Sequence, residues 1–155
     1  DGYASDITRT FPCRGRFTGP QRALYDIVLA AQAAAADCTS PSHDFNAGHE
    51  AAVRDLAQGM IDTGLLKGTL DDAIESASYQ RFYMHRTGHW LGLDVHDVGS
   101  YRDPLSKSDF RPWLKLETGM VLTIEPGIYI RPGPDVPEAF WNIGIRIEDD
   151  ALVTE

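Results

Sequence analysis

The hydrophobic pattern of this 155-residue sequence changes from helical to strand period near Gly88. From residue 18 up to that point apolar residues recur at helical spacing, and after it they alternate with polar residues as in strands. Helices that precede strands, instead of alternating with them, are typical of an α+β domain in which the helices pack on a mainly antiparallel sheet. The pattern therefore argues against repeated βαβ units, and the length suits a single domain with its own core.

Three helices are predicted in the first part of the chain. The first begins after Thr18 or Gly19 as its cap. The second spans residues 46–62 and stops before Gly64, and the third begins after Thr69. The apolar face of the first helix is predicted to consist of Leu24, Ile27, Val28, Ala31 and Ala35, and that of the second of Ala52, Val53, Leu56, Met60 and Ile61.

Two segments of the second part alternate in polarity, and each carries a carboxylate on its polar face. In IGIRIEDD the isoleucines at 143, 145 and 147 share one face, while Arg146 and Glu148 share the other. This pattern leaves open an ordinary exposed pair of the two charged residues. In MVLTIEPG, Glu125 closes the strand directly before a Pro-Gly break. A lone carboxylate is costly to bury, so Glu125 is exposed, paired or bound to a cation.

A third carboxylate, Asp6, lies in residues 3–11, which are rich in Thr, Ile and Tyr and are expected to form a strand. Its side chain either caps a turn, pairs with Arg9 or joins the other carboxylates.

Three of the five histidines lie in the stretch MHRTGHWLGLDVHD. His85 and His89 are four residues apart, so on a helical turn they would share a face, and His96 follows seven residues later. Arg86 occupies the glutamate position of a His-Glu-x-x-His motif, which excludes that zinc-protease motif. For any one of the three, a hydrogen-bonded core histidine is the alternative. The glycines among them allow a backbone or a ligand to approach closely.

The candidate metal ligands are Asp6, His89, Glu125 and Glu148. They offer hard carboxylate oxygens and one imidazole nitrogen, with no thiolate. Such a set suits manganese, cobalt, iron or magnesium better than a structural zinc. Several carboxylates also suit two adjacent cations, because a carboxylate can bridge them.

Composition narrows the classes of partner. Lys and Arg number 14 against 23 Asp and Glu, a net charge of −9, which argues against nucleic acid and anionic membranes as partners. The longest run of low polarity, residues 27–36, is far shorter than the roughly 20 residues that span a bilayer. Cys13 and Cys38 are too few for a disulfide framework, so we expect reduced thiols and a cytoplasmic location.

Four blocks in chain order, GYASDITRTFP, MHRTGHWLGLDVHDVG, TIEPGIYI and GIRIEDD, together resemble aminopeptidase P, the Xaa-Pro aminopeptidase of the pita-bread metallopeptidase superfamily. The resemblance extends over essentially the whole chain, and four ordered blocks are more specific than any one of them. It implies the pita-bread fold, a curved and mainly antiparallel sheet with helices on its outer face. Residues 1–155 are then expected to form one partial catalytic domain whose amino-terminal part is missing.

The resemblance also implies a pair of divalent cations, most often Mn²⁺, and a role for each matched residue. Asp6 and Glu148 would bridge the two cations, His89 would be the imidazole ligand, and Glu125 would bind a single cation. The residues implied to act in catalysis are His85, His96, Glu125 and Arg146. The two histidines orient the substrate and stabilise the reacting carbonyl, and the arginine steadies the carboxylates.

The activity that the resemblance implies is release of an amino-terminal residue that precedes proline. By this resemblance the cations would supply a bound hydroxide for attack on the carbonyl before proline. Glu125 would carry a proton to the leaving nitrogen, which has no hydrogen of its own. The expected partners are peptides with proline at the second position. Prolidase, which acts on Xaa-Pro dipeptides, is the close alternative, and a metal-free peptide-binding module of the same fold is the other.

The sequence departs from the family pattern at its start. The family's first metal aspartate, and a further histidine on the substrate side, lie upstream of the segment with which this sequence begins, and Asp1 does not match that aspartate. We therefore expect one cation with its full ligand set, single or partial metal occupancy, and an inactive 155-residue chain. An uncovered sheet edge also leads us to expect a homo-oligomer.

Overall fold

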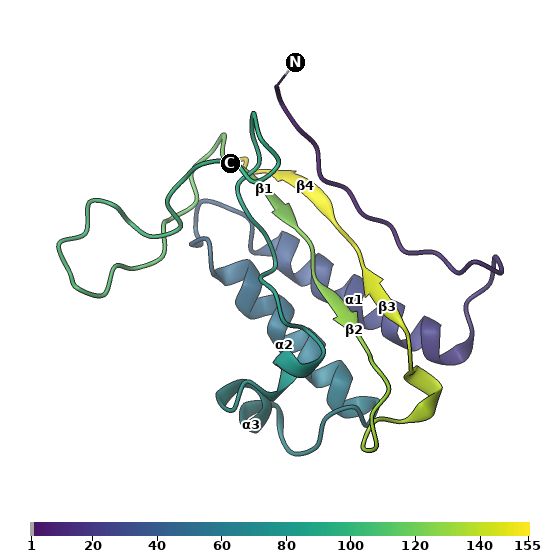
Figure 1. Cartoon of the computed structure of the whole chain (residues 1–155). Coiled ribbons are helices and arrows are strands. Elements are labelled where there is room, and N and C mark those ends of the chain that lie inside the picture. The colour runs from purple at the N-terminus through teal and green to yellow at the C-terminus, as the bar shows by residue number, and fades with distance from the viewer. Residues whose placement is uncertain (1) are drawn as a thin grey trace.

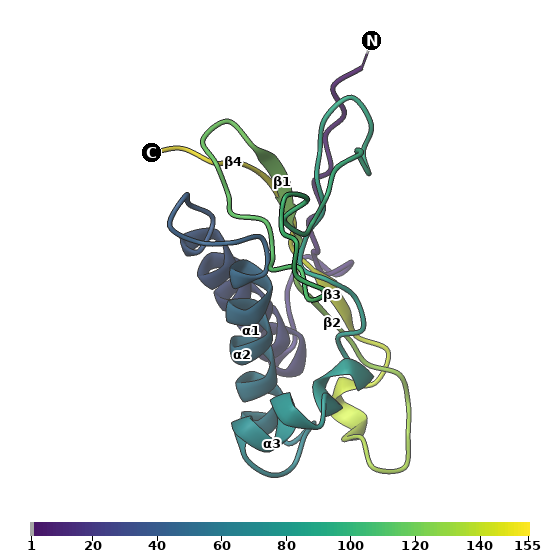
Figure 2. The same cartoon turned by 90° about the vertical axis from the view of Figure 1, so that its left-hand side faces the viewer.

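The computed structural model describes residues 2–155. Its helices and strands are α1 (Gly19–Asp37), α2 (Ala47–Asp62), α3 (Leu70–Glu75), β1 (Val121–Ile124), β2 (Gly127–Tyr129), β3 (Gly144–Arg146) and β4 (Asp149–Leu152), with 3-10 turns at Ser78–Arg81 and Glu138–Phe140. Helices α1 and α2 lie side by side against one face of the strands (Figure 1; Figure 2). The predicted order, helices first and strands afterwards, is confirmed.

The predicted starts of α1 and α3 are confirmed by reciprocal capping hydrogen bonds, whereas the side chain of Asn46 makes no capping bond at the start of α2. The Gln21 N–H donates to Thr18 Oγ1 over 3.4 Å, and the Gln21 side-chain oxygen accepts from the Thr18 N–H over 3.0 Å. Asp72 makes the same pair of contacts with Thr69, although its side chain is one carbon shorter than the usual glutamate. Gly64, with φ +74°, follows the end of α2 as predicted.

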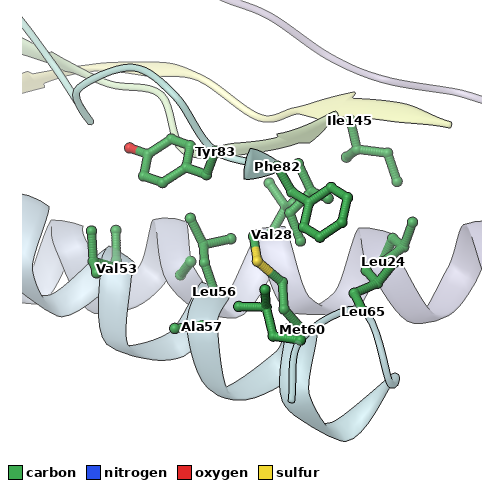
Figure 3. Close-up of a cluster of buried hydrophobic side chains, with 14 of the residues drawn as sticks. Leu24, Val28, Val53, Leu56, Ala57, Met60, Leu65, Phe82, Tyr83 and Ile145 are labelled. Carbon is green, nitrogen blue, oxygen red and sulfur yellow. The ribbon is translucent and has the colours of Figure 1, made fainter. Parts of the chain in front are cut away.

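The core lies between the two long helices and the strands (Figure 3). Six side chains from the predicted helix faces have no exposed surface: Leu24, Val28, Ala31, Ala52, Leu56 and Met60. Ile128 and Ile145 cover this layer from β2 and β3. Each fully buried Leu or Ile contributes roughly 1.5–3 kcal/mol relative to an exposed one, so this layer is the main source of stability. Ile27 and Ile61 belong to the same faces but are only partly buried.

Each predicted strand segment is interrupted once. β1 pairs with β4 and β2 pairs with β3, both antiparallel, and the interruptions fall at residues 125–126 and 147–148. Single bridges extend the sheet on both sides, from Leu122 to Trp90 and from Glu148 to Thr8. Four stretches of chain therefore lie side by side, and the mainly antiparallel sheet is confirmed.

The predicted strand at residues 3–11 is wrong as a regular strand. This segment is extended, but it makes only the single bridge through Thr8. On either side of the bridge, side chains replace the backbone partners of a ladder. The Asp6 N–H donates to the Asp150 carboxylate, and the Thr10 hydroxyl both donates to the Arg146 carbonyl and accepts from its N–H. The segment is held against the sheet without forming a continuous ladder (Figure 1).

Within residues 2–155, none of the helices combines the length and the apolar character required to cross a bilayer. The two cysteines are not joined to each other, and Cys13 is exposed.

A buried hydrogen-bond network ties α2 to the segment that carries the histidines. The Thr87 hydroxyl lies 2.8 Å from His49 Nδ1 and 2.6 Å from the Tyr83 hydroxyl. Burial lowers the pKa of His49 to about 4, with smaller contributions from the charges of Arg86 and His85. His49 is therefore neutral in the folded protein above that pH.

We expect His49→Asn to flatten the dependence of stability on pH between about 6.5 and 4. In that window the unfolded chain binds a proton at His49 that the folded protein does not, so the free energy of unfolding falls by up to about 3 kcal/mol as the pH falls. Asparagine keeps a polar atom near the position of Nδ1 and does not titrate. Urea unfolding at several pH values measures the difference, and parallel curves for the two proteins would contradict the assignment.

We expect Gly59→Ala to destabilise the fold by about 1–2 kcal/mol. A Cβ at position 59 would lie 2.5–2.8 Å from three side-chain carbons of Ile27, and the overpacking exceeds the gain of about 1 kcal/mol in helix propensity. In a double-mutant cycle with Ile27→Ala, the two losses should be less than additive, because the second change removes the clash. Additive losses in urea unfolding would show that the helices do not meet at this point.

Candidate metal centre

Four residues that are far apart in the sequence meet on the face of the sheet opposite to the helices. His89 Nε2 lies 3.5 Å from Asp6 Oδ2 and 3.4 Å from Glu125 Oε1. The ligand atoms of His89, Glu125 and Glu148 all lie within 4.8 Å of one another. The structure thus brings together all four side chains that the sequence marks as candidate ligands.

The interruptions of the strands place the two glutamates. Ladder β1–β4 ends at the pair Ile124↔Asp149, and ladder β2–β3 begins at the pair Gly127↔Arg146. Glu125 and Glu148 lie in the gap between these ladders, Glu125 between β1 and β2 and Glu148 between β3 and β4. Their neighbours Ile124 and Ile147 are buried in the core beneath, so alternation directs both carboxylates away from the helices.

The segment that carries His89 is not helical, so the two histidines four residues apart do not share a helical turn. It runs beside β1 instead. The Thr123 N–H donates to the His89 carbonyl over 2.9 Å, and the Glu125 N–H donates to the Thr87 carbonyl over 2.7 Å. Gly88 makes this approach possible, because a Cβ there would lie 2.0 Å from the Thr123 carbonyl oxygen. The expectation of a close backbone approach at a glycine is confirmed.

The environment of His89 fixes which of its nitrogens faces the carboxylates. Nδ1 lies 3.0 Å from the Trp90 carbonyl oxygen, which only accepts hydrogen bonds, so Nδ1 carries the hydrogen. In the neutral ring Nε2 then keeps its lone pair, directed at Asp6 and Glu125. A neutral Nε2 among carboxylate oxygens is the usual form of a histidine ligand to a metal.

Glu148 is the most deeply buried member of the cluster, with 1% of its side chain exposed. Burial raises the pKa of its carboxyl, and the neighbouring Glu125 and Asp6 charges raise it further. Two contacts act in the opposite direction: the Thr8 hydroxyl donates to Oε2 over 2.5 Å, and Arg146 Nε lies 3.5 Å from the same oxygen. Arg146 Nη1 also lies 3.9 Å from Glu125 Oε2.

The donor set fits a divalent cation. Three carboxylates that repel one another surround one imidazole nitrogen with its lone pair turned inward, and Arg146 is the one guanidinium beside the glutamates among the described ion pairs. A cation within such a set removes the repulsion and satisfies the lone pair. The exposed Arg146–Glu148 pair that the sequence left open is excluded, because the carboxylate is buried.

His85 and His96, the two histidines expected to act on the substrate, lie at different distances from this cluster. A ring nitrogen of His96 falls within 4.8 Å of ligand atoms of Asp6 and His89, and its ring packs edge-on against that of His89 at 4.4 Å. His85 belongs to neither group of potential ligands. Its Nδ1 lies 2.7 Å from the Arg86 carbonyl, and its Nε2 lies 2.8 Å from the Tyr129 hydroxyl.

Two threonines take part in the site without having been assigned a role from the sequence. Thr8 joins Arg146 to Glu148, and the Thr123 hydroxyl donates to Glu125 Oε1 over 3.3 Å. Both threonines lie two residues from a candidate ligand on an extended segment, which puts them on the same face. This two-residue spacing from a candidate ligand is the sequence signal that could have identified both threonines. The Asp6–Arg9 pair left open by the sequence does not form, since Arg9 pairs with Asp149. Asp1 lies outside the described residues.

A cavity of about 570 Å³ opens beside the cluster. Its lining includes the predicted site residues His85, His89, His96, Glu125 and Arg146. Aromatic side chains, Phe45, Tyr101 and Trp113, form another part of its wall. A concave site with convergent polar groups and an apolar wall is the usual form of a small-ligand or peptide site.

Comparison with known proteins identifies relatives of this arrangement. An Xaa-Pro aminopeptidase of Haemophilus influenzae is 50% identical over 153 residues, which cover 99% of this chain and 34% of the relative. An Xaa-Pro aminopeptidase of Escherichia coli is 47% identical, with 99% of this chain and 33% of the relative covered. This chain therefore spans about a third of the length of the curated relatives that it matches.

The solved structure of the Pseudomonas aeruginosa aminopeptidase PepP matches with a TM-score of 0.91 at 51% identity, over 98% of this chain and 33% of that one. The family model described as Metallopeptidase family M24 matches residues 1–155. Membership of such a family implies a divalent metal ion, in agreement with the donor set. The chain belongs to metallopeptidase family M24, and its helices and antiparallel sheet have the pita-bread fold.

Proposed function

We propose that this chain is a catalytic-domain portion of an Xaa-Pro aminopeptidase, a metallopeptidase that releases an amino-terminal residue preceding proline. The observation that carries the proposal is the position of His89 Nε2, 3.4 Å and 3.5 Å from oxygens of Glu125 and Asp6 and beside the buried Glu148. The names of the relatives from Haemophilus influenzae and Escherichia coli support the substrate class.

Asp6, His89, Glu125 and Glu148 would hold the metal. Their carboxylate-rich donor set suits several divalent cations, and Mn²⁺ is the proposed one because the resemblance to aminopeptidase P implies it. Divalent cations supply Lewis acidity in such a site, since they lower the pKa of water and polarise a carbonyl oxygen. Aminopeptidase P of Escherichia coli has been solved in a zinc-substituted form with product. His96 is a further candidate ligand from its place beside Asp6 and His89.

Glu125 is the proposed proton carrier. Its two oxygens have different partners, since Oε1 accepts from Thr123 and Oε2 lies 3.9 Å from Arg146. The nitrogen of a prolyl peptide bond has no hydrogen and must gain a proton before it leaves. A carboxylate at the edge of the cavity, held by two partners, is placed to transfer that proton.

His85 and His96 are proposed to orient the substrate and to stabilise the reacting carbonyl oxygen. Both line the cavity with the candidate ligands. The hydroxyl of Tyr129 and the Arg86 carbonyl hold His85 by its two nitrogens, which fixes the plane of its ring. Arg146 is a positioning residue, because the Thr8 hydroxyl accepts from its Nε and Nη2 while donating to Glu148.

Prolidase remains the close alternative, and hydrolysis of Ala-Pro against Ala-Pro-Ala by the longer enzyme, of which this chain is proposed to be a portion, separates the two activities. A metal-free binding module is the other alternative, and no binding of divalent cations would favour it. The homo-oligomer and the cytoplasmic location stay predictions of the sequence.

We expect calorimetric titration of the 155-residue chain with Mn²⁺ to show one site that His89→Ala removes. His89 supplies the single imidazole nitrogen whose lone pair faces the carboxylates. His43→Ala is the control, since His43 bonds only to Ser40 and Ser42 among the described side chains and should leave binding unchanged. Two tight sites would contradict the expected partial occupancy, and no binding would contradict the metal centre.

We expect Thr8→Val to weaken Mn²⁺ binding by about tenfold or more. The valine removes the hydroxyl that joins Glu148 to Arg146, and loss of such a partner commonly reduces metal affinity about 10–100-fold. Thr10→Val is the matched control on the same segment, because the Thr10 hydroxyl bonds only to the Arg146 backbone. Equal losses of affinity in the two variants would show that the segment, and not the Thr8 hydroxyl, matters.

A further inference from the structure

Arg86 lies in the middle of the histidine segment and has no role in the proposed chemistry. Its side chain is exposed, and it lines the same cavity as His89 and Glu125. Within residues 2–155, no described ion pair gives it a carboxylate oxygen within 4.0 Å. In a chain of net charge −9, the cavity therefore contains a guanidinium without a direct carboxylate partner among the described ion pairs.

The guanidinium of Arg86 is held by two neighbours that are themselves uncharged. Its Cζ lies 4.7 Å from the centre of the Trp113 ring, and Nη2 donates to the side-chain oxygen of Asn46. Asn46 is buried and is itself fixed by a hydrogen bond to Glu50. Stacking occupies a face of a guanidinium and leaves the N–H groups at its edge available, which is the geometry that binds a carboxylate through two hydrogen bonds.

A second guanidinium strengthens the positive potential at the same indole. Arg102 Cζ lies 3.3 Å from the centre of the Trp113 ring, and Arg102 also has no carboxylate partner among the described ion pairs. Two guanidinium groups on one indole repel each other, and a bound anion relieves that repulsion. Trp113, Phe45 and Tyr101 supply apolar surface around this point of the cavity.

We propose that Arg86, stacked on Trp113 and supported by Arg102, forms a subsite that binds a carboxylate of the peptide on the carboxyl side of the cleaved bond. The inference rests on the proposed function. An aminopeptidase substrate carries a positive amine at its other end, which a guanidinium repels, so the amine end lies away from Arg86. The carboxylate is either the carboxyl terminus of a short peptide or an acidic side chain.

The test measures binding of uncleavable peptides by calorimetry to the Mn²⁺-loaded 155-residue chain. The probes are Pro-Leu and its amide, Pro-Leu-NH2, neither of which has a residue before proline. We expect Pro-Leu to bind about tenfold more tightly than its amide, because only the free acid carries the carboxylate. Pro-Glu-NH2 and Pro-Gln-NH2 then tell a terminal carboxylate from one on a side chain.

The variants assign the preference to Arg86. In Arg86→Gln the ratio of the two affinities should fall to about one, and Arg86→Lys should keep only part of it, since an ammonium lacks the paired N–H groups. Trp113→Leu should also reduce the ratio by removing the stacking surface. Arg131→Gln is the matched control, because it removes one positive charge from an exposed position outside the cavity lining.

Three outcomes would overturn the proposal. Equal affinity of the wild type for acid and amide would exclude the subsite while supporting peptide binding. A ratio unchanged in Arg86→Gln would place the carboxylate on another group, such as Arg146 or the metal. Failure of every peptide to bind would overturn the proposed function together with the subsite.

Discussion

The arrangement of the whole site depends on the contacts that stabilise the buried Glu148 carboxylate. With 1% of its side chain exposed, this group depends on partners, because a buried charge without them is strongly unfavourable. The Thr8 hydroxyl and the Arg146 guanidinium provide them, and the contact with Thr8 holds the amino-terminal segment against the interrupted strands. Asp6 precedes Thr8 by two residues and so projects from the same face, which brings it to His89. One buried charge therefore positions the second carboxylate.

The break between the two ladders, in which Glu148 lies, also makes the site concave. A continuous hairpin would pair residues 125 and 148 through their backbones and leave a flat surface. Because Pro126 has no N–H to contribute, the ladder stops there and resumes at Gly127. The helix layer beneath compensates for the lost pairing, since Ile124 and Ile147 on either side of the gap are buried against it. Stability comes from one face of the sheet, and the candidate chemistry occupies the other.

The sequence predicted well those features that depend on local chemistry. Capping residues such as Thr18 and Thr69 marked the helix starts, and period-two alternation separated the buried isoleucines from Arg146 and Glu148. The helical periodicity also identified the faces that form the core. These signals work because each is decided within a few residues of the chain.

Features decided by distant segments were harder to predict. Residues 3–11 have strand composition, yet carboxylate and hydroxyl groups replace the ladder partners, so no regular strand forms. The His85–His89 spacing suits a helix, but Gly88 must approach the Thr123 carbonyl, and that contact imposes an extended path. Arg86 and Trp113 lie in two loops 27 positions apart and meet through the face of the indole, and no sequence periodicity predicts such a pair.

The charges around the cavity are separated in space, with carboxylates gathered around His89 and the Arg86 guanidinium on the aromatic wall. A peptide is a dipole of the opposite sense once its amine lies near the carboxylates, so this distribution favours one orientation of a bound peptide over its reverse.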